Sequence, residues 1–197
     1  MPKLRRHLLS RVLERLGKSQ EIDSIDPSTI ILKYDRMYHH NLVHVNYTTY
    51  DVRRAQDVIN YANSHHNIML LADYDSNTRL TNEANFYKYA CTLGTYHINV
   101  IYVGPGSVDY QSQRMEFLWV RWYDVAETRL SGWKNSRLDR LRFLPVTRHD
   151  AFGFVDPSDV LRGCHIIPRF SLGLQHSGGL SYSGKDSEDW REYYVNR

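Results

Sequence analysis

Cysteine is scarce in this chain: Cys91 and Cys164 are the only two, and they lie far apart in the sequence. Small secreted proteins that depend on disulfides carry more cysteine, so that class is disfavoured. Residues 1–6 lack the apolar core of a signal peptide, which favours an intracellular, reducing compartment. Apolar runs are also short, and none approaches the roughly 20 residues of a membrane-spanning helix. We therefore expect a soluble protein without a membrane partner.

Charge of one sign is not in large excess either. The chain has 25 lysines and arginines against 22 aspartates and glutamates, which leaves a formal net charge of +3. Such a mildly basic chain is compatible with nucleic acid or with an acidic partner, and requires neither. Aromatic residues, by contrast, are abundant, with 15 tyrosines and four tryptophans. Because aromatic side chains favour strands and interaction surfaces, the composition favours a β-rich domain.

Large aromatic side chains crowd around one arginine in residues 115–123, Met-Glu-Phe-Leu-Trp-Val-Arg-Trp-Tyr. Side chains alternate along a strand, so both faces of this segment carry large apolar groups. A two-sided aromatic strand is typical of the middle of a small closed or sandwiched β structure. We expect Trp119 and Trp122 to lie in the core, with Arg121 reaching a wet edge.

Apolar residues at three- and four-residue spacing predict an amphipathic helix over residues 4–16, which Gly17 stops and whose other face is basic. Residues 18–29 are polar, contain an Asp-Pro step and predict a linker. β-Branched and aromatic residues indicate strands in the rest of the chain. The expected strands cover residues 30–34, 42–47, 68–72, 87–93, 96–102, 115–123, 152–155, 164–167 and 193–195.

Three successive strands with glycine-rich connections, the first two joined near Gly94, indicate an antiparallel meander. Residues 73–84 and the basic stretch 129–142 predict loops. The sequence thus predicts a mainly β (α+β) fold, a small antiparallel β-barrel or strongly curved sheet with an N-terminal helix. The expected parts are a basic amphipathic helix over residues 1–17, a linker over 18–29 and a single barrel-like domain over 30–197.

Side chains suited to catalysis or metal binding are scattered. Neighbouring histidines do not easily complete one tetrahedral site, and no Cys-x-x-Cys or His-x-x-x-His pair accompanies them. A nucleophilic pair of Cys164 with His165 is disfavoured because neighbours along a strand point to opposite faces. The aspartates that a two-metal nuclease would need lie mostly in predicted turns. We expect no catalytic residue, no metal and no cofactor, and a metal-dependent nuclease or transposase fragment is kept as an alternative.

Basic and aromatic residues alternate between residues 114 and 148. Arginines there would neutralise phosphates while aromatic rings stack on bases or hold a peptide, and solvated arginines beside core tryptophans are the equally weighted alternative. The candidate nucleic-acid contacts in this stretch are Arg129, Trp133, Lys134, Arg137, Arg140 and Arg142. A secondary candidate patch, for which a solvated helix face is the alternative, consists of Arg5, Arg6 and Arg11.

Four runs are distinctive when taken together: residues 2–11, Pro-Lys-Leu-Arg-Arg-His-Leu-Leu-Ser-Arg; 44–54, His-Val-Asn-Tyr-Thr-Thr-Tyr-Asp-Val-Arg-Arg; the aromatic strand 115–123; and 151–168, which begins Ala-Phe-Gly-Phe-Val-Asp-Pro. They resemble the C-terminal region of transposon-derived proteins of mushroom-type fungi, similar to Plavaka and other CACTA-like transposases. The resemblance spans nearly the whole chain. It implies an accessory part of a larger transposase-like protein, whose catalytic part lies upstream.

The order of residues 87–102, 115–123, 151–166 and 189–195 is more loosely similar to bromo-adjacent homology (BAH) domains and to the small barrel appended to plant CACTA transposases. That similarity implies a BAH- or SH3-like β-barrel that contacts chromatin or protein. In this chain Arg162-Gly-Cys lacks the lysine that such modules carry between the glycine and the cysteine. The identity of a ligand therefore does not carry over.

Together these observations predict a non-catalytic accessory domain that binds DNA or chromatin in the nucleus. The first alternative is a protein–protein module, in which tyrosine-rich loops and Trp133 hold a peptide or a histone tail. A decayed mobile-element remnant without a present function is a further alternative.

Overall fold

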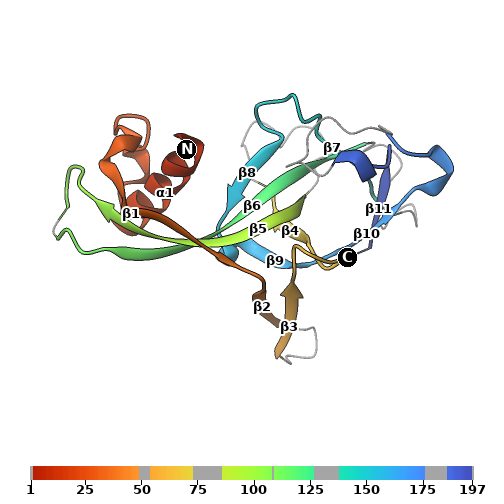
Figure 1. Cartoon of the computed structure of the whole chain (residues 1–197), viewed down its shortest axis with the longest axis horizontal. Helices are drawn as coiled ribbons and strands as arrows, with labels where there is room; N and C mark the ends of the chain where they lie inside the picture. Colours follow the sequence, from red (N-terminus) through yellow and green to blue (C-terminus); the bar gives the residue numbers. More distant parts are fainter. Residues whose placement is uncertain are drawn as a thin grey trace.

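The computed structural model describes residues 2–48, 54–72, 86–107, 109–126, 138–175 and 186–196. The helix α1 (Pro2–Arg15) comes first and is followed by a mainly β structure (Figure 1). The helix ends where Gly17 takes a positive φ of 69°, and two hydrogen bonds close its last turn, from Lys18 N to Leu13 O and from Gly17 N to Glu14 O. This is a Schellman motif, in which glycine adopts the left-handed conformation without a steric penalty.

Two long strands form the spine of the sheet. β5 (Tyr87–Tyr102) and β6 (Gln113–Val125) pair antiparallel along most of their length. β4 (Asn67–Leu71) pairs with the first half of β5, and β1 (Ile30–His40) pairs with its second half. The shorter strands are β7 (Arg140–Phe143), β8 (Phe152–Val155), β9 (Val160–Gly163), β10 (His165–Pro168) and β11 (Tyr193–Asn196).

The sheet nearly closes on itself. Its strand order is β10-β11-β7-β6-β5-β4-β9, and β9 and β10 are separated in sequence by Cys164 alone. The two ends of that order are therefore parts of one almost continuous strand. Cys164 N donates to Asn67 O at 3.0 Å and extends the β4–β9 pairing across the junction. The prediction of a mainly β fold, with a small antiparallel barrel after an N-terminal helix, is confirmed.

β2 (Val43–Thr48) and β3 (Arg54–Ile59) form a separate two-stranded hairpin, which projects from the barrel wall in Figure 1. Short 3-10 helices complete the description: η1 (Ser19–Glu21), η2 (Pro27–Thr29), η5 (Pro157–Asp159), η6 (Phe170–Leu172) and η7 (Asp186–Glu188). None of the helices in the described ranges has both the length and the apolar composition needed to cross a bilayer.

Three groups of buried side chains hold the fold together. The first packs α1 on the sheet: Leu8, Leu9 and Leu13 are fully buried in one cluster with side chains of β1, β5 and β6. The second lies between the hairpin and strands β4, β6, β8 and β9. The third fills the barrel and includes the partly buried Trp119. Trp122 packs against the second cluster, so both tryptophans belong to the core, as predicted.

The segment 18–29, predicted as a linker, contains η1 and η2 and buries Ile25 in the same cluster as α1. The helix, this segment and the barrel strands therefore share one core.

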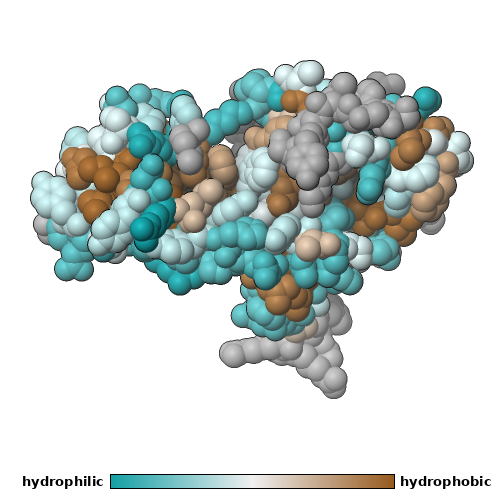
Figure 2. Space-filling view, in the orientation of Figure 1, coloured by the Kyte–Doolittle hydropathy of each residue, from teal (hydrophilic) through white to brown (hydrophobic). Residues whose placement is uncertain are grey.

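On the face seen in Figure 2, hydrophobic colour gathers at the end of the molecule where η6 lies, and Phe170 there is 64% exposed.

Three sequence-based expectations need correction. Residues 87–102 form one strand, not two strands joined at Gly94. A Cβ on Gly94 would lie 2.7 Å from the ring of Tyr96, so the glycine makes room for an aromatic side chain on the same strand and not for a turn. Residues 140–142, the end of the stretch expected as a loop, belong to β7, in which Leu141 and Phe143 are buried. Residues 54–59, for which no strand was predicted, form β3.

Candidate functional site

The described part of the predicted basic stretch lies at one rim of the barrel, on the β6–β7 hairpin. β6 and β7 pair through Tyr123 with Phe143 and through Val125 with Leu141. Ala126 N then donates to Arg140 O at 2.8 Å. The two segments that flank residues 127–137 in the sequence thus lie side by side at this rim. Four predicted contact residues lie outside the described residues: Arg129, Trp133, Lys134 and Arg137.

Arg140 and Arg142, the other two predicted contacts, lie on β7 and already have carboxylate neighbours. Arg142 binds Asp124 Oδ2 through Nη2 at 2.9 Å and through Nε at 3.2 Å, with both side chains about half exposed. Arg140 Nη1 lies 3.5 Å from Glu192 Oε2. Ion pairs at such exposure contribute about 0–1 kcal/mol. Arg142 could therefore exchange Asp124 for another anion at little cost.

The three arginines predicted on α1 have different surroundings. Arg11 forms an ion pair with Asp156, and its Nη1 donates to Glu116 O at 2.5 Å; only 11% of its side chain is exposed. Arg6 forms an exposed pair with Asp23 at 2.5 Å, and Arg5 is partly buried. Figure 1 shows α1 and β7 at opposite ends of the molecule. Arg140 and Arg142 therefore lie on a different surface from the arginines of α1, and Arg11 helps to dock the helix on the barrel.

His7 also belongs to the helix–barrel contact. Its ring lies 6.1 Å from that of Phe154. Burial, with a smaller contribution from the charge of Arg11, lowers the pKa of His7 to about 4, and Asp156 opposes this shift. The imidazole is therefore neutral at neutral pH, and the docked helix excludes its charged form.

Arg121 is buried in the barrel and does not reach a wet edge as expected. It forms an ion pair with Asp189 at 2.6 Å, and the two side chains are only 4% and 5% exposed. Its guanidinium carbon also lies 4.0 Å from the ring centre of Phe143. This pair fixes the segment that precedes β11 against β6 and β7.

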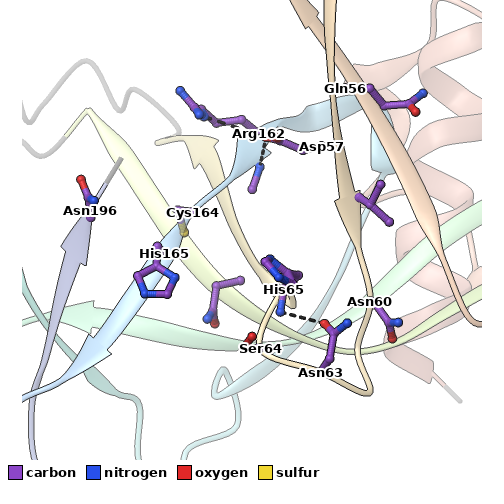
Figure 3. A pocket seen from close by; sticks show the side chains of 13 residues that line it. Gln56, Asp57, Asn60, Asn63, Ser64, His65, Arg162, Cys164, His165 and Asn196 are labelled. Atoms are coloured by element: carbon purple, nitrogen blue, oxygen red, sulfur yellow. Dashed lines mark hydrogen bonds and ion pairs between the residues drawn. The ribbon is translucent and has the colours of Figure 1, made fainter.

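A cleft of about 550 Å³ lies between the hairpin and the junction of β9 and β10 (Figure 3). Polar side chains dominate its wall. β3 and the turn that follows contribute Gln56, Asp57, Val58, Asn60, Asn63, Ser64 and His65, and the barrel contributes Asn67, Arg162, Gly163, Cys164, His165 and Asn196.

Asp57 connects the hairpin to the barrel at this cleft. Its Oδ2 accepts a hydrogen bond from Gly163 N at 2.8 Å and lies 3.9 Å from Arg162 Nε. The guanidinium of Arg162 lies over the ring of Tyr47, 5.1 Å from its centre. The Asp57 carboxylate thus faces β9 and has its partners there.

The turn between β3 and β4 fixes the orientation of two asparagine side chains. Asn60 Oδ1 accepts from Ala62 N at 2.9 Å, and Asn63 Oδ1 accepts from His65 N at 2.8 Å. Both are Asx turns, in which a side-chain oxygen replaces a backbone acceptor. Deeper in the cleft, Asn67 Oδ1 accepts from the hydroxyl of Tyr123 at 3.1 Å. In all three amides the oxygen is engaged, so the NH₂ group is the end that remains as a donor.

Cys164 has no property of a catalytic nucleophile. Burial raises the pKa of its thiol to about 12, so the thiolate that would react is hardly populated at neutral pH. Within the described ranges, no three His, Cys, Asp or Glu side chains gather in a way that would hold a metal ion.

Sequence reasoning did not find this cleft. Its near wall had a signal, because asparagines at positions 60 and 63 in a polar connection are typical of Asx turns. Residues 162–165 of its far wall are about a hundred residues away in the sequence, and only the closure of the barrel brings them there.

The strand order and the packing of α1 define a small antiparallel β-barrel module with a docked N-terminal helix. Comparisons with protein-family models, with curated proteins and with solved structures find no match for the chain. The predicted kinship with transposon-derived proteins and with BAH domains therefore stays a prediction.

Proposed function

We propose that this chain is a non-catalytic accessory module of a transposase-like nuclear protein and that it binds DNA or chromatin through the β6–β7 rim. The observation that carries this proposal is the attachment of the basic stretch. β6 and β7, which flank residues 127–137 in the sequence, pair with each other at positions next to Arg140 and Arg142. The two candidate cations that the structure describes, Arg140 and Arg142, therefore lie together on one strand at this rim.

Two physical features support phosphate as the partner of this rim. Arginine offers a planar fork of donors that matches phosphate oxygens, and Arg142 already uses two of these donors on one carboxylate oxygen. Arg140 and Arg142 also lie on a paired strand, so their backbone is ordered before binding, which favours affinity. The resemblance to BAH-like barrels favours chromatin as the setting, and the raised pKa of Cys164 agrees with a module without catalysis.

Fluorescence anisotropy with a labelled duplex DNA over a series of salt concentrations tests the proposal. Each phosphate contact lowers the slope of log K against log salt by about 0.9, so the five cations Arg129, Lys134, Arg137, Arg140 and Arg142 would give up to about −4.5. Because backbone contacts carry no sequence information, the double variant Arg137→Glu, Arg140→Glu should weaken binding for every duplex sequence.

Arg114→Glu is the matched control. Arg114 forms an exposed ion pair with Glu116 at 2.8 Å, but it lies at the end of β6 that is remote from the β7 pairing. The control should bind DNA like the wild type. Binding that ignores salt, or no binding at low salt, would refute the proposal.

A further inference from the structure

The geometry points to a second binding site, in the cleft between β3 and the β9–β10 junction, for an extended peptide segment that carries carboxylate side chains. This site does not involve the β6–β7 rim and does not rest on the DNA proposal. It is argued from the position of the strand edges, from the hydrogen-bonding groups on the cleft wall and from the size of the cleft.

The cleft runs along strand edges and not over a strand face. Gln56, Asp57 and Val58 are consecutive in β3, and all three line it. Because neighbouring side chains of a strand point to opposite faces, a cavity that touches every residue of such a run lies beside the strand. Within the described residues, β3 pairs as a strand with β2 alone, so its other edge is open. An open edge is a template for an extended chain.

The wall of the cleft offers mainly hydrogen-bond donors. The amide oxygens of Asn60 and Asn63 are fixed by the turn, and that of Asn67 by Tyr123, which leaves three NH₂ groups. Arg162 adds a guanidinium that is 41% exposed, at 3.9 Å from its nearest acidic neighbour. Donors of this kind, on both walls of one cleft, fit a ligand rich in acceptor oxygens.

Carboxylates fit this wall better than neutral acceptors. Asp57, the acidic residue among those that line the cleft, accepts from Gly163 N, and its carboxylate is turned towards β9. The ion pair of Arg162 with that carboxylate is long, at 3.9 Å, so Arg162 can form a shorter, charge-assisted bond to a ligand. A Glu or Asp side chain of the peptide would lie between Arg162 and the asparagine amides.

The size of the cleft agrees with a short segment. Its volume of about 550 Å³ is within the roughly 300–1,000 Å³ of ligand sites. Residues 162–165, which line the barrel side, are consecutive, and four residues of extended chain span about 13 Å. A peptide segment of about that length would fill the cleft.

The test measures the anisotropy of two fluorescein-labelled ten-residue peptides, one alternating Glu with Ser and the other alternating Gln with Ser. The Glu peptide should bind about tenfold more tightly, the effect of one charge-assisted hydrogen bond. Asn63→Asp keeps an oxygen for the His65 N–H but replaces the NH₂ donor by a second oxygen, so it should weaken binding of the Glu peptide by about tenfold or more. Arg162→Gln should do the same.

Asn46→Asp is the control. Asn46 lies on the same hairpin, its Oδ1 accepts from Gln56 Nε2 at 2.9 Å, and it does not line the cleft. This variant should bind the Glu peptide like the wild type, and thermal unfolding should show that all variants are folded. Three results would overturn the inference. The Glu and Gln peptides could bind with equal affinity, both Asn63→Asp and Arg162→Gln could bind the Glu peptide like the wild type, or no peptide could bind up to about 1 mM.

A DNA arm keeps the two sites apart. Duplex DNA should bind Asn63→Asp as it binds the wild type, and Arg137→Glu, Arg140→Glu should bind the Glu peptide as the wild type does. If DNA displaces the peptide from the wild type and loses affinity in Asn63→Asp, the cleft is a nucleic-acid site and the peptide inference fails.

Discussion

Removal of one partner of the Arg121–Asp189 pair should destabilise the protein strongly. The two side chains are 4% and 5% exposed and 2.6 Å apart, so Asp189→Asn removes a carboxylate that lies against the buried guanidinium. The loss of one partner from a buried ion pair costs about 3–5 kcal/mol. Small domains unfold with about 5–15 kcal/mol in total, so this single change would remove a large share of the stability.

Urea unfolding followed by tryptophan fluorescence measures this loss. With a slope of about 2 kcal/mol per molar urea, a loss of about 4 kcal/mol moves the midpoint down by about 2 M. A second variant, Arg121→Met combined with Asp189→Leu, removes both charges and should recover much of the loss, because hydrophobic replacement of a whole buried pair is often neutral.

The matched control is Asp150→Asn. Asp150 pairs with Arg148 at the similar distance of 2.5 Å, but the two side chains are 41% and 54% exposed. Its midpoint should stay close to that of the wild type, because water and salt screen an exposed pair. If Asp189→Asn lowers the midpoint no more than Asp150→Asn does, burial does not determine the contribution of these pairs and the reasoning is refuted.

Two further predictions concern the helix contact and the long strand. Burial lowers the pKa of His7 from 6.5 to about 4, so as the pH falls the unfolded chain binds a proton at His7 before the folded chain does. The free energy of unfolding should therefore decrease between about pH 6.5 and 4, by up to about 3 kcal/mol. Urea midpoints measured over this pH range test this, and the same decrease in His7→Phe would contradict it. Gly94→Ala should cost about 1–3 kcal/mol of stability, because its Cβ would meet the Tyr96 ring at 2.7 Å. Gly163→Ala is the control and should be tolerated, because the nearest atom to its Cβ would be at 3.6 Å. If both variants lower the melting temperature equally, the steric explanation is excluded.

Patterns of alternating side chains predicted the fold class but not every strand. The aromatic segment 115–123 identified the central strand because its two faces are both apolar, and the structure places it in β6. In residues 140–143 the same alternation is present, with Leu141 and Phe143 inside and two arginines outside, but the number of basic residues suggested a loop. β3 has few β-branched residues and is a strand because β2 pairs with it.

Long-range contacts account for what the sequence could not show. Nothing local to Arg121 indicates that Asp189 will meet it in the core, and local patterning alone places an arginine at an edge. The cleft has the same origin. The Asx turn at Asn63 is visible in the sequence, whereas Arg162 comes to face it only through the register of β9 on β4.

The closure of the barrel by the β9–β10 strand has a consequence for the order of folding. β5 and β6 are neighbours in the chain and can pair early, but β4 pairs with β9 across some ninety residues. Because long loops must be ordered before such contacts form, this pairing should be among the slow steps. Until residues 160–163 arrive, the outer edge of β4 is exposed to other chains. A ribosome that pauses before them would hold an open sheet, which is the form most prone to pair with a neighbour.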